Sequence, residues 1–218
     1  MLKIANFSAV IFDMDGLVLN TEASYFIAWQ QAAAQMGYTL SDTFCESLSG
    51  LAGTGDKLLA ECGADFDLPY FKQIAGTIWR DHVTQHGIEV KRGFNELLAF
   101  IIQQQLPYCL ATNSRRENAL ECLALAGLSD VFTNITSRDD VTEYKPAPDI
   151  FLTAAKTLQV PVQQCLVLED SHAGIVAATK AGAYAVFVPS STTIDPLTLE
   201  LCAVMMPDLL DVLESLRA

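Results

Sequence analysis

Short runs of apolar residues recur along the chain, with segments of helical periodicity between them. Five of these runs are too short for a helix and too continuously apolar for a strand with one face in water. They cover residues 9–12, 108–111, 131–135, 165–168 and 183–188. Continuous apolar runs of this length are typical of central strands in a parallel sheet covered on both faces. The pattern therefore predicts a parallel sheet.

Helical patterns alternate with these runs from about residue 93 onward, and they cover residues 118–126, 149–159, 171–181 and 208–217. Ser114 and Glu117 have the spacing of a capping box in front of the first of these segments, and Gly127 ends it. Strands that alternate with helices indicate an α/β fold. We expect a doubly wound, Rossmann-like parallel sheet.

Residues 20–90 interrupt this alternation. They show helical periodicity near 21–36, 41–49, 56–62 and 69–86, without a convincing strand. An all-helical insertion after the first strand accounts for this. We expect an α/β core domain of residues 1–17 and 91–218, and a helical cap domain of residues 18–90. Because ligands of such sheets bind at the carboxyl ends of the strands, we expect the cap to act as a lid.

The charge and the cysteine content of the chain restrict the classes of partner and the cellular compartment that can be expected. The 218 residues include 13 Lys and Arg against 26 Asp and Glu, a formal net charge of −13. This charge argues against binding to nucleic acid or an anionic membrane, since both need basic patches. The six cysteines are widely spread, which favours reduced thiols in a cytoplasmic protein. The chain shows no apolar stretch of membrane-spanning length and no signal-peptide pattern, so we expect a soluble cytoplasmic protein. A small-molecule partner and a monomer are the further expectations.

Two carboxylates, Asp13 and Asp15, directly follow the first apolar run, and Gly16 allows a tight turn behind them. An acidic turn, a calcium loop, and a nucleophile with an acid–base partner are the possible interpretations. The calcium loop fails on spacing, because a third ligand before the glycine is absent and Ser24 stands at the twelfth position instead of Glu. The other two interpretations are equally good on these residues alone.

Polar residues also follow the second and third runs. Thr112 and Asn113 precede a helix start, where a hydroxyl, an amide and backbone N–H groups make a phosphate cradle. Lys145 precedes two prolines that stiffen the loop, and its ammonium could neutralise a phosphoryl group. Taken alone, Lys145 is better explained as a solvent-exposed surface lysine.

A second acidic pair, Glu169 and Asp170, stands at the end of the fourth run. Hard oxygen ligands from Asp13 and Asp170 suit Mg²⁺. The acidic groups gathered at one edge of the sheet would also repel one another strongly without a cation. A bound divalent metal is therefore expected.

The segments Asp-Met-Asp-Gly-Leu, Thr-Asn-Ser, Lys-Pro-Ala-Pro-Asp and Glu-Asp-Ser occur in this order between residues 13 and 171. In combination they resemble the four motifs of the haloacid dehalogenase superfamily. The insertion after the first motif resembles the helical cap of its subfamily I. That branch holds β-phosphoglucomutase-like proteins and small sugar-phosphate phosphatases.

The resemblance implies a Mg²⁺-dependent phosphatase of a small phosphorylated metabolite, most simply a sugar phosphate. Asp13 would attack phosphorus and form an aspartyl-phosphate, and Asp15 would act as general acid and then general base. The Asp13 side chain, the Asp15 carbonyl and Asp170 would hold Mg²⁺, with Glu169 nearby.

The remaining site residues would contact the substrate. Lys145, Thr112 and Asn113 would help to offset the charge of the phosphoryl group. Glu22, near the start of the first cap helix, has two equally good interpretations. In the first interpretation, its side chain points toward the polar leaving group of the substrate. In the second, it is a glutamate in the first turn of a helix, where the helix dipole favours a negative charge.

Two cap positions depart from the β-phosphoglucomutase-like pattern. Tyr25 stands where those proteins carry a histidine, and Gly53 where they carry an arginine. A phosphatase is therefore favoured over a phosphosugar mutase, which is the alternative activity. The alternative substrate is a nucleotide-like monophosphate. If the protein is not an enzyme, the alternative is a catalytically inactive binding module with the same fold. The sequence assigns no role to Tyr25, Thr54 or Lys57.

Overall fold

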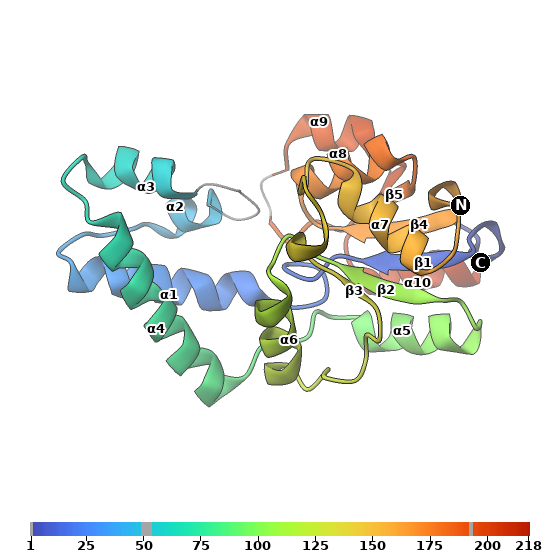
Figure 1. Cartoon of the computed structure of the whole chain (residues 1–218), viewed down its shortest axis with the longest axis horizontal. Helices are drawn as coiled ribbons and strands as arrows, with labels where there is room; N and C mark the ends of the chain where they lie inside the picture. Colours follow the sequence, from blue (N-terminus) through green and yellow to red (C-terminus); the bar gives the residue numbers. More distant parts are fainter. Residues whose placement is uncertain (1, 49–53, 192–193) are drawn as a thin grey trace. The chain divides into compact units, whose positions relative to one another are not determined.

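The computed structural model describes residues 2–48, 54–191 and 194–218. The chain divides into two compact units, which Figure 1 shows as a sheet with helices and a group of helices. Met1–Leu19 and Glu89–Ala218 form the α/β unit, and Asn20–Ile88 form the helical unit. These boundaries lie two residues inside the expected cap limits of 18 and 90.

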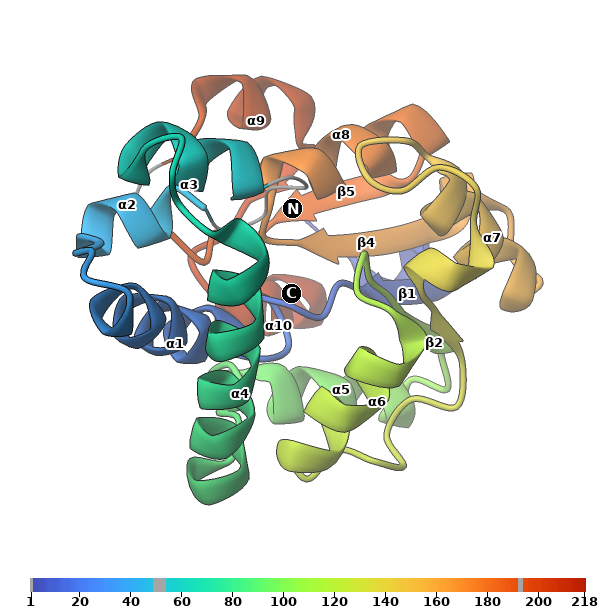
Figure 2. The same ribbon diagram turned by 60° about the vertical axis from the view of Figure 1, so that its left-hand side comes forward.

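The α/β unit contains a parallel sheet. In the described residues its six strands have the order β3-β2-β1-β4-β5-β6. They are β1 (Ala9–Phe12), β2 (Tyr108–Ala111), β3 (Ile135–Thr136), β4 (Cys165–Glu169), β5 (Tyr184–Phe187) and β6 (Val204–Met205). The first strand of the sequence thus lies inside the sheet, between β2 and β4 (Figure 2). The predicted α/β fold with a doubly wound parallel sheet is confirmed.

Helices cover both faces of this sheet. Ile11 of β1 belongs to a buried cluster with residues of α7 (Asp149–Thr157) and α8 (His172–Ala181). Phe12 points to the opposite face, where its ring meets that of Phe94 at 5.6 Å. There α5 (Phe94–Gln103) packs against α10 (Leu209–Arg217). Within the described residues, the remaining α-helices of the unit are α6 (Arg116–Leu125) and α9 (Pro196–Leu201).

The prediction of a strand at residues 131–135 is wrong in its position. The strand β3 comprises only Ile135 and Thr136, and the residues before it form a turn. Phe132 in this turn is 5% exposed, and its ring contacts those of Phe12, Phe94 and Tyr108. The apolar character of the run therefore comes from a turn packed into the core. The short strand β6 was not predicted.

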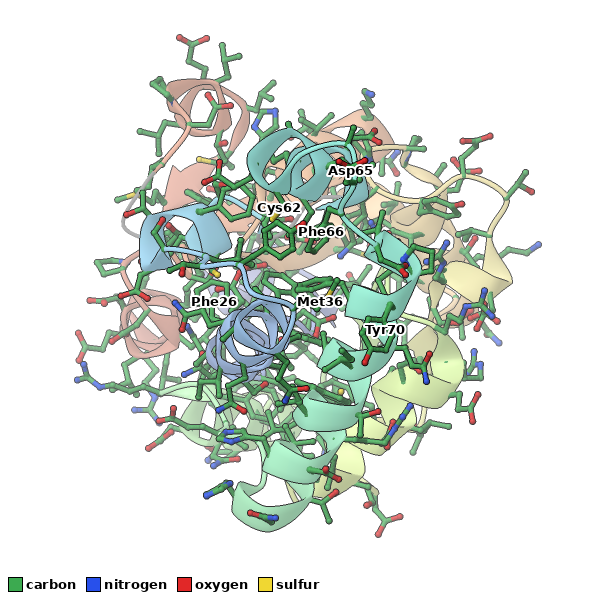
Figure 3. The ribbon with its side chains drawn as sticks, turned by 90° about the vertical axis from the view of Figure 1, so that its left-hand side faces the viewer. Phe26, Met36, Cys62, Asp65, Phe66 and Tyr70 are labelled. Carbon is green, nitrogen blue, oxygen red and sulfur yellow. The ribbon has the colours of Figure 1, made fainter. Side chains whose placement is uncertain are left out.

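The helical unit contains α1 (Thr21–Gln35), α2 (Asp42–Glu46), α3 (Thr54–Cys62) and α4 (Leu68–His86). The helices α1 and α4 pack along each other, and α3 adds the buried Leu58. Phe66 belongs to the core of this unit, and the partly buried Met36 and Cys62 pack against that core; Figure 3 labels all three side chains. None of the helices in the described ranges is long and apolar enough to span a membrane.

The cap positions singled out in the sequence have contacts inside the helical unit. Tyr25 stacks on Trp79 at 5.1 Å between ring centroids and on Trp29 at 5.9 Å. Lys57 donates a hydrogen bond of 2.8 Å to the carbonyl of Ser47. Thr54 is the first residue of α3. Gly53 lies outside the described residues.

Candidate active site

Three predicted site residues meet at one edge of the sheet because their strands are parallel. Asp13 follows β1, Thr112 follows β2, and Glu169 ends β4. The register places Phe12 beside Leu110 and Leu168, so the three strands reach the edge together. This edge is formed by the carboxyl ends of the strands, where ligands of open α/β sheets bind.

Lys145 extends its side chain into the centre of this group. Its ammonium donates hydrogen bonds to a carboxylate oxygen of Asp13, to Oε1 of Glu169 at 2.5 Å, and to the carbonyl of Ala111 at 2.9 Å. Burial acts to lower the pKa of Lys145, but Asp13 and Glu169 raise it above its usual value. Lys145 is 4% exposed, so its interpretation as a surface lysine is wrong.

Glu169 is fully buried, and both of its carboxylate oxygens accept hydrogen bonds. One oxygen accepts from Lys145. The other accepts from the backbone N–H groups of Asp170 and Ser171, each at 3.1 Å, and from the Ser171 hydroxyl at 3.0 Å. The Ser171 hydroxyl in turn accepts from the N–H of Gly174 and caps α8. Glu169 therefore holds Lys145 against the start of α8.

Asp15 is joined to the end of β2 through two hydroxyl groups. Its oxygen Oδ2 accepts hydrogen bonds from Ser114 at 2.8 Å and from Thr112 at 3.4 Å. The helix α6 begins at Arg116 without a side-chain cap, so the capping box predicted from Ser114 is wrong. Sequence reasoning missed Ser114 as a site residue, because its spacing from Glu117 already accounted for its hydroxyl.

The side chain of Asn113 pairs with the backbone of Lys145. Its Oδ1 accepts a hydrogen bond of 3.0 Å from the Lys145 N–H, and its Nδ2 donates one of 3.3 Å to the Lys145 carbonyl. Asn113 was expected to face a phosphate group, and the structure shows its amide bound to the neighbouring loop.

Asp13, Glu169 and Asp170 form a group that could hold a metal ion. Each offers one carboxylate oxygen, and these oxygens lie within 4.8 Å of one another. Burial raises the pKa of Asp13 to about 8; Lys145 opposes this rise, whereas Glu169 and Asp15 add to it. The single ammonium of Lys145 can balance only one of the three carboxylate charges of this group. Because hard carboxylate oxygens suit Mg²⁺, the donor set fits this ion.

The turn after Asp13 leaves room for Asp170 only because residue 16 is glycine. The backbone of Gly16 has a φ of +81°, a value that residues other than glycine rarely adopt. A Cβ atom at this position would lie 2.0 Å from Oδ2 of Asp170. In the sequence, this close approach is indicated by the glycine that directly follows Asp13 and Asp15.

Glu22 lies in the first turn of α1 and belongs to the helical unit. Its contact with a leaving group stays a prediction.

Comparisons with known proteins find relatives over most of the chain. Residues 10–188 match the family model described as haloacid dehalogenase-like hydrolase. The chain is 31% identical to the phosphorylated carbohydrates phosphatase of Thermotoga maritima, over 80% of this chain and 81% of that protein. It is also 31% identical to the beta-phosphoglucomutase of Bacillus subtilis, over 83% of this chain and 82% of that protein.

A solved structure is similar over nearly the whole chain. The crystal structure of a hydrolase from Pseudomonas syringae superposes with a TM-score of 0.77 at 28% identity, over 96% of this chain and 98% of that one. The matched residues of the family model include all four motif segments, from Asp13 to Ser171. The chain therefore belongs to the haloacid dehalogenase-like hydrolases.

Proposed function

We propose that this hydrolase is a Mg²⁺-dependent phosphatase that releases phosphate from a small phosphomonoester, with a sugar phosphate as the favoured substrate. The buried contact between Asp13 and Lys145 carries the proposal, because it places a potential nucleophile beside a charge that attracts phosphate. The similarity to a phosphatase of phosphorylated carbohydrates supports the substrate class.

The reaction would proceed in two displacements at phosphorus. In the first, a carboxylate oxygen of Asp13 attacks phosphorus, and the bond from phosphorus to the leaving oxygen breaks while Asp15 donates a proton to that oxygen. In the second, water attacks the aspartyl-phosphate, Asp15 takes up a proton from this water, and the bond to Asp13 breaks. Lys145 and Thr112 would offset charge on the phosphoryl oxygens.

Asp13, the backbone carbonyl of Asp15, and Asp170 would hold Mg²⁺, which when bound supplies positive charge that stabilises the phosphoryl oxygens. Glu169 would remain bound to Lys145, because both of its oxygens already accept hydrogen bonds from the protein. Its part in the metal site would therefore be to add negative charge nearby.

A panel of phosphomonoesters tests the proposed function. Sugar phosphates and nucleoside monophosphates are incubated with the protein and Mg²⁺, and the released phosphate is measured. We expect release from at least one sugar phosphate, loss of release when EDTA removes the metal, and recovery when excess Mg²⁺ is added. Absence of release across the whole panel would contradict the proposal.

A separate incubation distinguishes a phosphatase from a mutase. The protein is given β-glucose 1-phosphate together with glucose 1,6-bisphosphate. We expect no accumulation of glucose 6-phosphate beyond that formed by hydrolysis of the bisphosphate. Formation of glucose 6-phosphate without free phosphate would establish the mutase in place of the phosphatase.

The hydroxyl of Ser114 is expected to matter for turnover. The variant Ser114→Ala removes the 2.8 Å hydrogen bond to Asp15, so the acid–base group loses its better-placed hydroxyl partner. We expect kcat to fall about tenfold with little change in KM, since general acid–base catalysis depends on the position of the group.

Two further variants make this prediction specific. Ser114→Thr keeps the hydroxyl and should recover most of the lost turnover. Ser8→Ala removes an exposed hydrogen bond to Gln164 and should leave kcat unchanged. Equal kcat values for Ser114→Ala and the unaltered protein would show that Asp15 needs no help from this hydroxyl.

A further inference from the structure

We infer that Asn113 is a positioning residue, which holds the backbone of Lys145 and acts on the reaction only through it. This inference rests on the proposed function, in which Lys145 offsets phosphoryl charge. The two hydrogen bonds of 3.0 Å and 3.3 Å run in opposite directions between one amide and one residue of the backbone. Such a pair fixes both the place and the orientation of the Lys145 backbone.

Lys145 depends on its backbone position because it belongs to neither a helix nor a strand. Its ammonium must reach Asp13, Glu169 and the Ala111 carbonyl at the same time. A shift of the loop would lengthen these contacts, and misplacement of about 1 Å can cost a hundredfold in rate. The amide of Asn113 supplies the restraint from the neighbouring strand end.

Three consecutive side chains after β2 thus serve the two reacting groups. Thr112 and Ser114 donate to Asp15, and Asn113 between them binds Lys145. The chain bends at Asn113 and Ser114, directly after the end of β2, and the N–H of Ser114 donates a hydrogen bond of 3.0 Å to the Thr112 hydroxyl. Residues 112–114 therefore contact both the acid–base group Asp15 and the residue whose ammonium would bind phosphate, Lys145.

A direct contact between the Asn113 amide and the phosphate is the competing interpretation. The Oδ1 atom is an acceptor and cannot donate to a phosphate oxygen. One N–H bond of Nδ2 is directed to the Lys145 carbonyl. The observed geometry therefore favours binding to the loop over binding to the phosphate.

A double-mutant cycle separates the two interpretations. Asn113→Ala is measured alone and together with Lys145→Met, using the best substrate from the phosphomonoester panel. We expect kcat to fall about tenfold or more for Asn113→Ala alone, and less than about twofold further when Lys145 is already replaced. A loss of the same size in both backgrounds, with weaker inhibition by inorganic phosphate in both, would show that Asn113 binds phosphate itself.

Amide hydrogen exchange tests the inference without activity. In the unaltered protein the Lys145 N–H is held by Asn113, so Asn113→Ala should speed its exchange about tenfold or more. Asn134→Ala is the matched control, because its side chain makes only a weak contact of 3.4 Å with Thr133, and exchange at Lys145 should not change. Unchanged exchange in Asn113→Ala would overturn the inference even if the protein is a phosphatase. Faster exchange in a protein that hydrolyses no phosphomonoester would uphold the positioning of Lys145 and refute the proposed function alone.

Discussion

The variant Asp13→Asn is expected to lose phosphatase turnover, with kcat falling on the order of 10⁴-fold or more. An amide is a poor nucleophile and cannot form the aspartyl-phosphate on which both displacements depend. The shape of the side chain is unchanged, and the amide oxygen can still accept a hydrogen bond from Lys145. The loss should therefore appear in phosphate release while the midpoint of thermal unfolding stays near that of the unaltered protein.

Asp130→Asn provides the matched control, because it makes the same chemical change at an exposed position. Its turnover should equal that of the unaltered protein. Mass spectrometry after rapid acid quenching adds a direct measurement, since one phosphoryl group should be found on the unaltered protein and none on Asp13→Asn. Turnover retained by Asp13→Asn would rule out a covalent intermediate on this residue.

The variant Gly174→Ala is expected to destabilise the protein by about 3 kcal/mol, at the upper end of the usual cost of overpacking. A Cβ atom at position 174 would lie 1.8 Å from Cδ of Glu169 and 1.9 Å from its Oε1. The Glu169 side chain is fully buried and cannot move aside without losing its bonds to Lys145 and Ser171. Urea unfolding measures the loss of stability, and phosphate release should fall with it because Lys145 loses one of its carboxylate partners.

Gly76→Ala is the control for this prediction. Gly76 lies within α4, and nothing would meet a Cβ atom there within 4 Å. The same substitution should therefore raise the free energy of unfolding by roughly 0.5–1 kcal/mol, the usual gain of alanine over glycine inside a helix. Similar stabilities for the two variants would mean that the close approach of Glu169 to Gly174 has no energetic consequence.

Two local patterns along the chain have a different structural cause from the one they predict. The run at residues 131–135 carries the same apolar signal whether it forms a strand or a turn that buries Phe132 in the core. Ser114 has the spacing of a capping box, and its actual partner, Asp15, lies 99 residues away in the chain. Local patterns reveal which residues are polar or apolar, but several different contacts satisfy the same pattern.

The sequence by itself determined the alternation of strands and helices in the α/β unit, apart from β6 and the position of β3, together with the family and the residues that gather at the edge of the sheet. Asp13 and Glu169 could be placed there because the carboxyl ends of parallel strands share one edge, so position along the chain implies position in space. The four motif segments then indicated phosphoryl chemistry. The order of the elements follows from the periodicity of the residues alone, whereas the family and the phosphoryl chemistry follow from the resemblance of the four motif segments to those of a known family.

Only the tertiary structure decided how these residues are paired. It buried Lys145 between Asp13, 132 residues away, and Glu169, 24 residues away, and it directed Asn113 to the Lys145 backbone. Hydrogen bonds and charge interactions depend on distances of a few ångströms, which the separation along the chain does not set. The expected charged site thus became a defined network, in which one lysine is held by two carboxylates and by one asparagine.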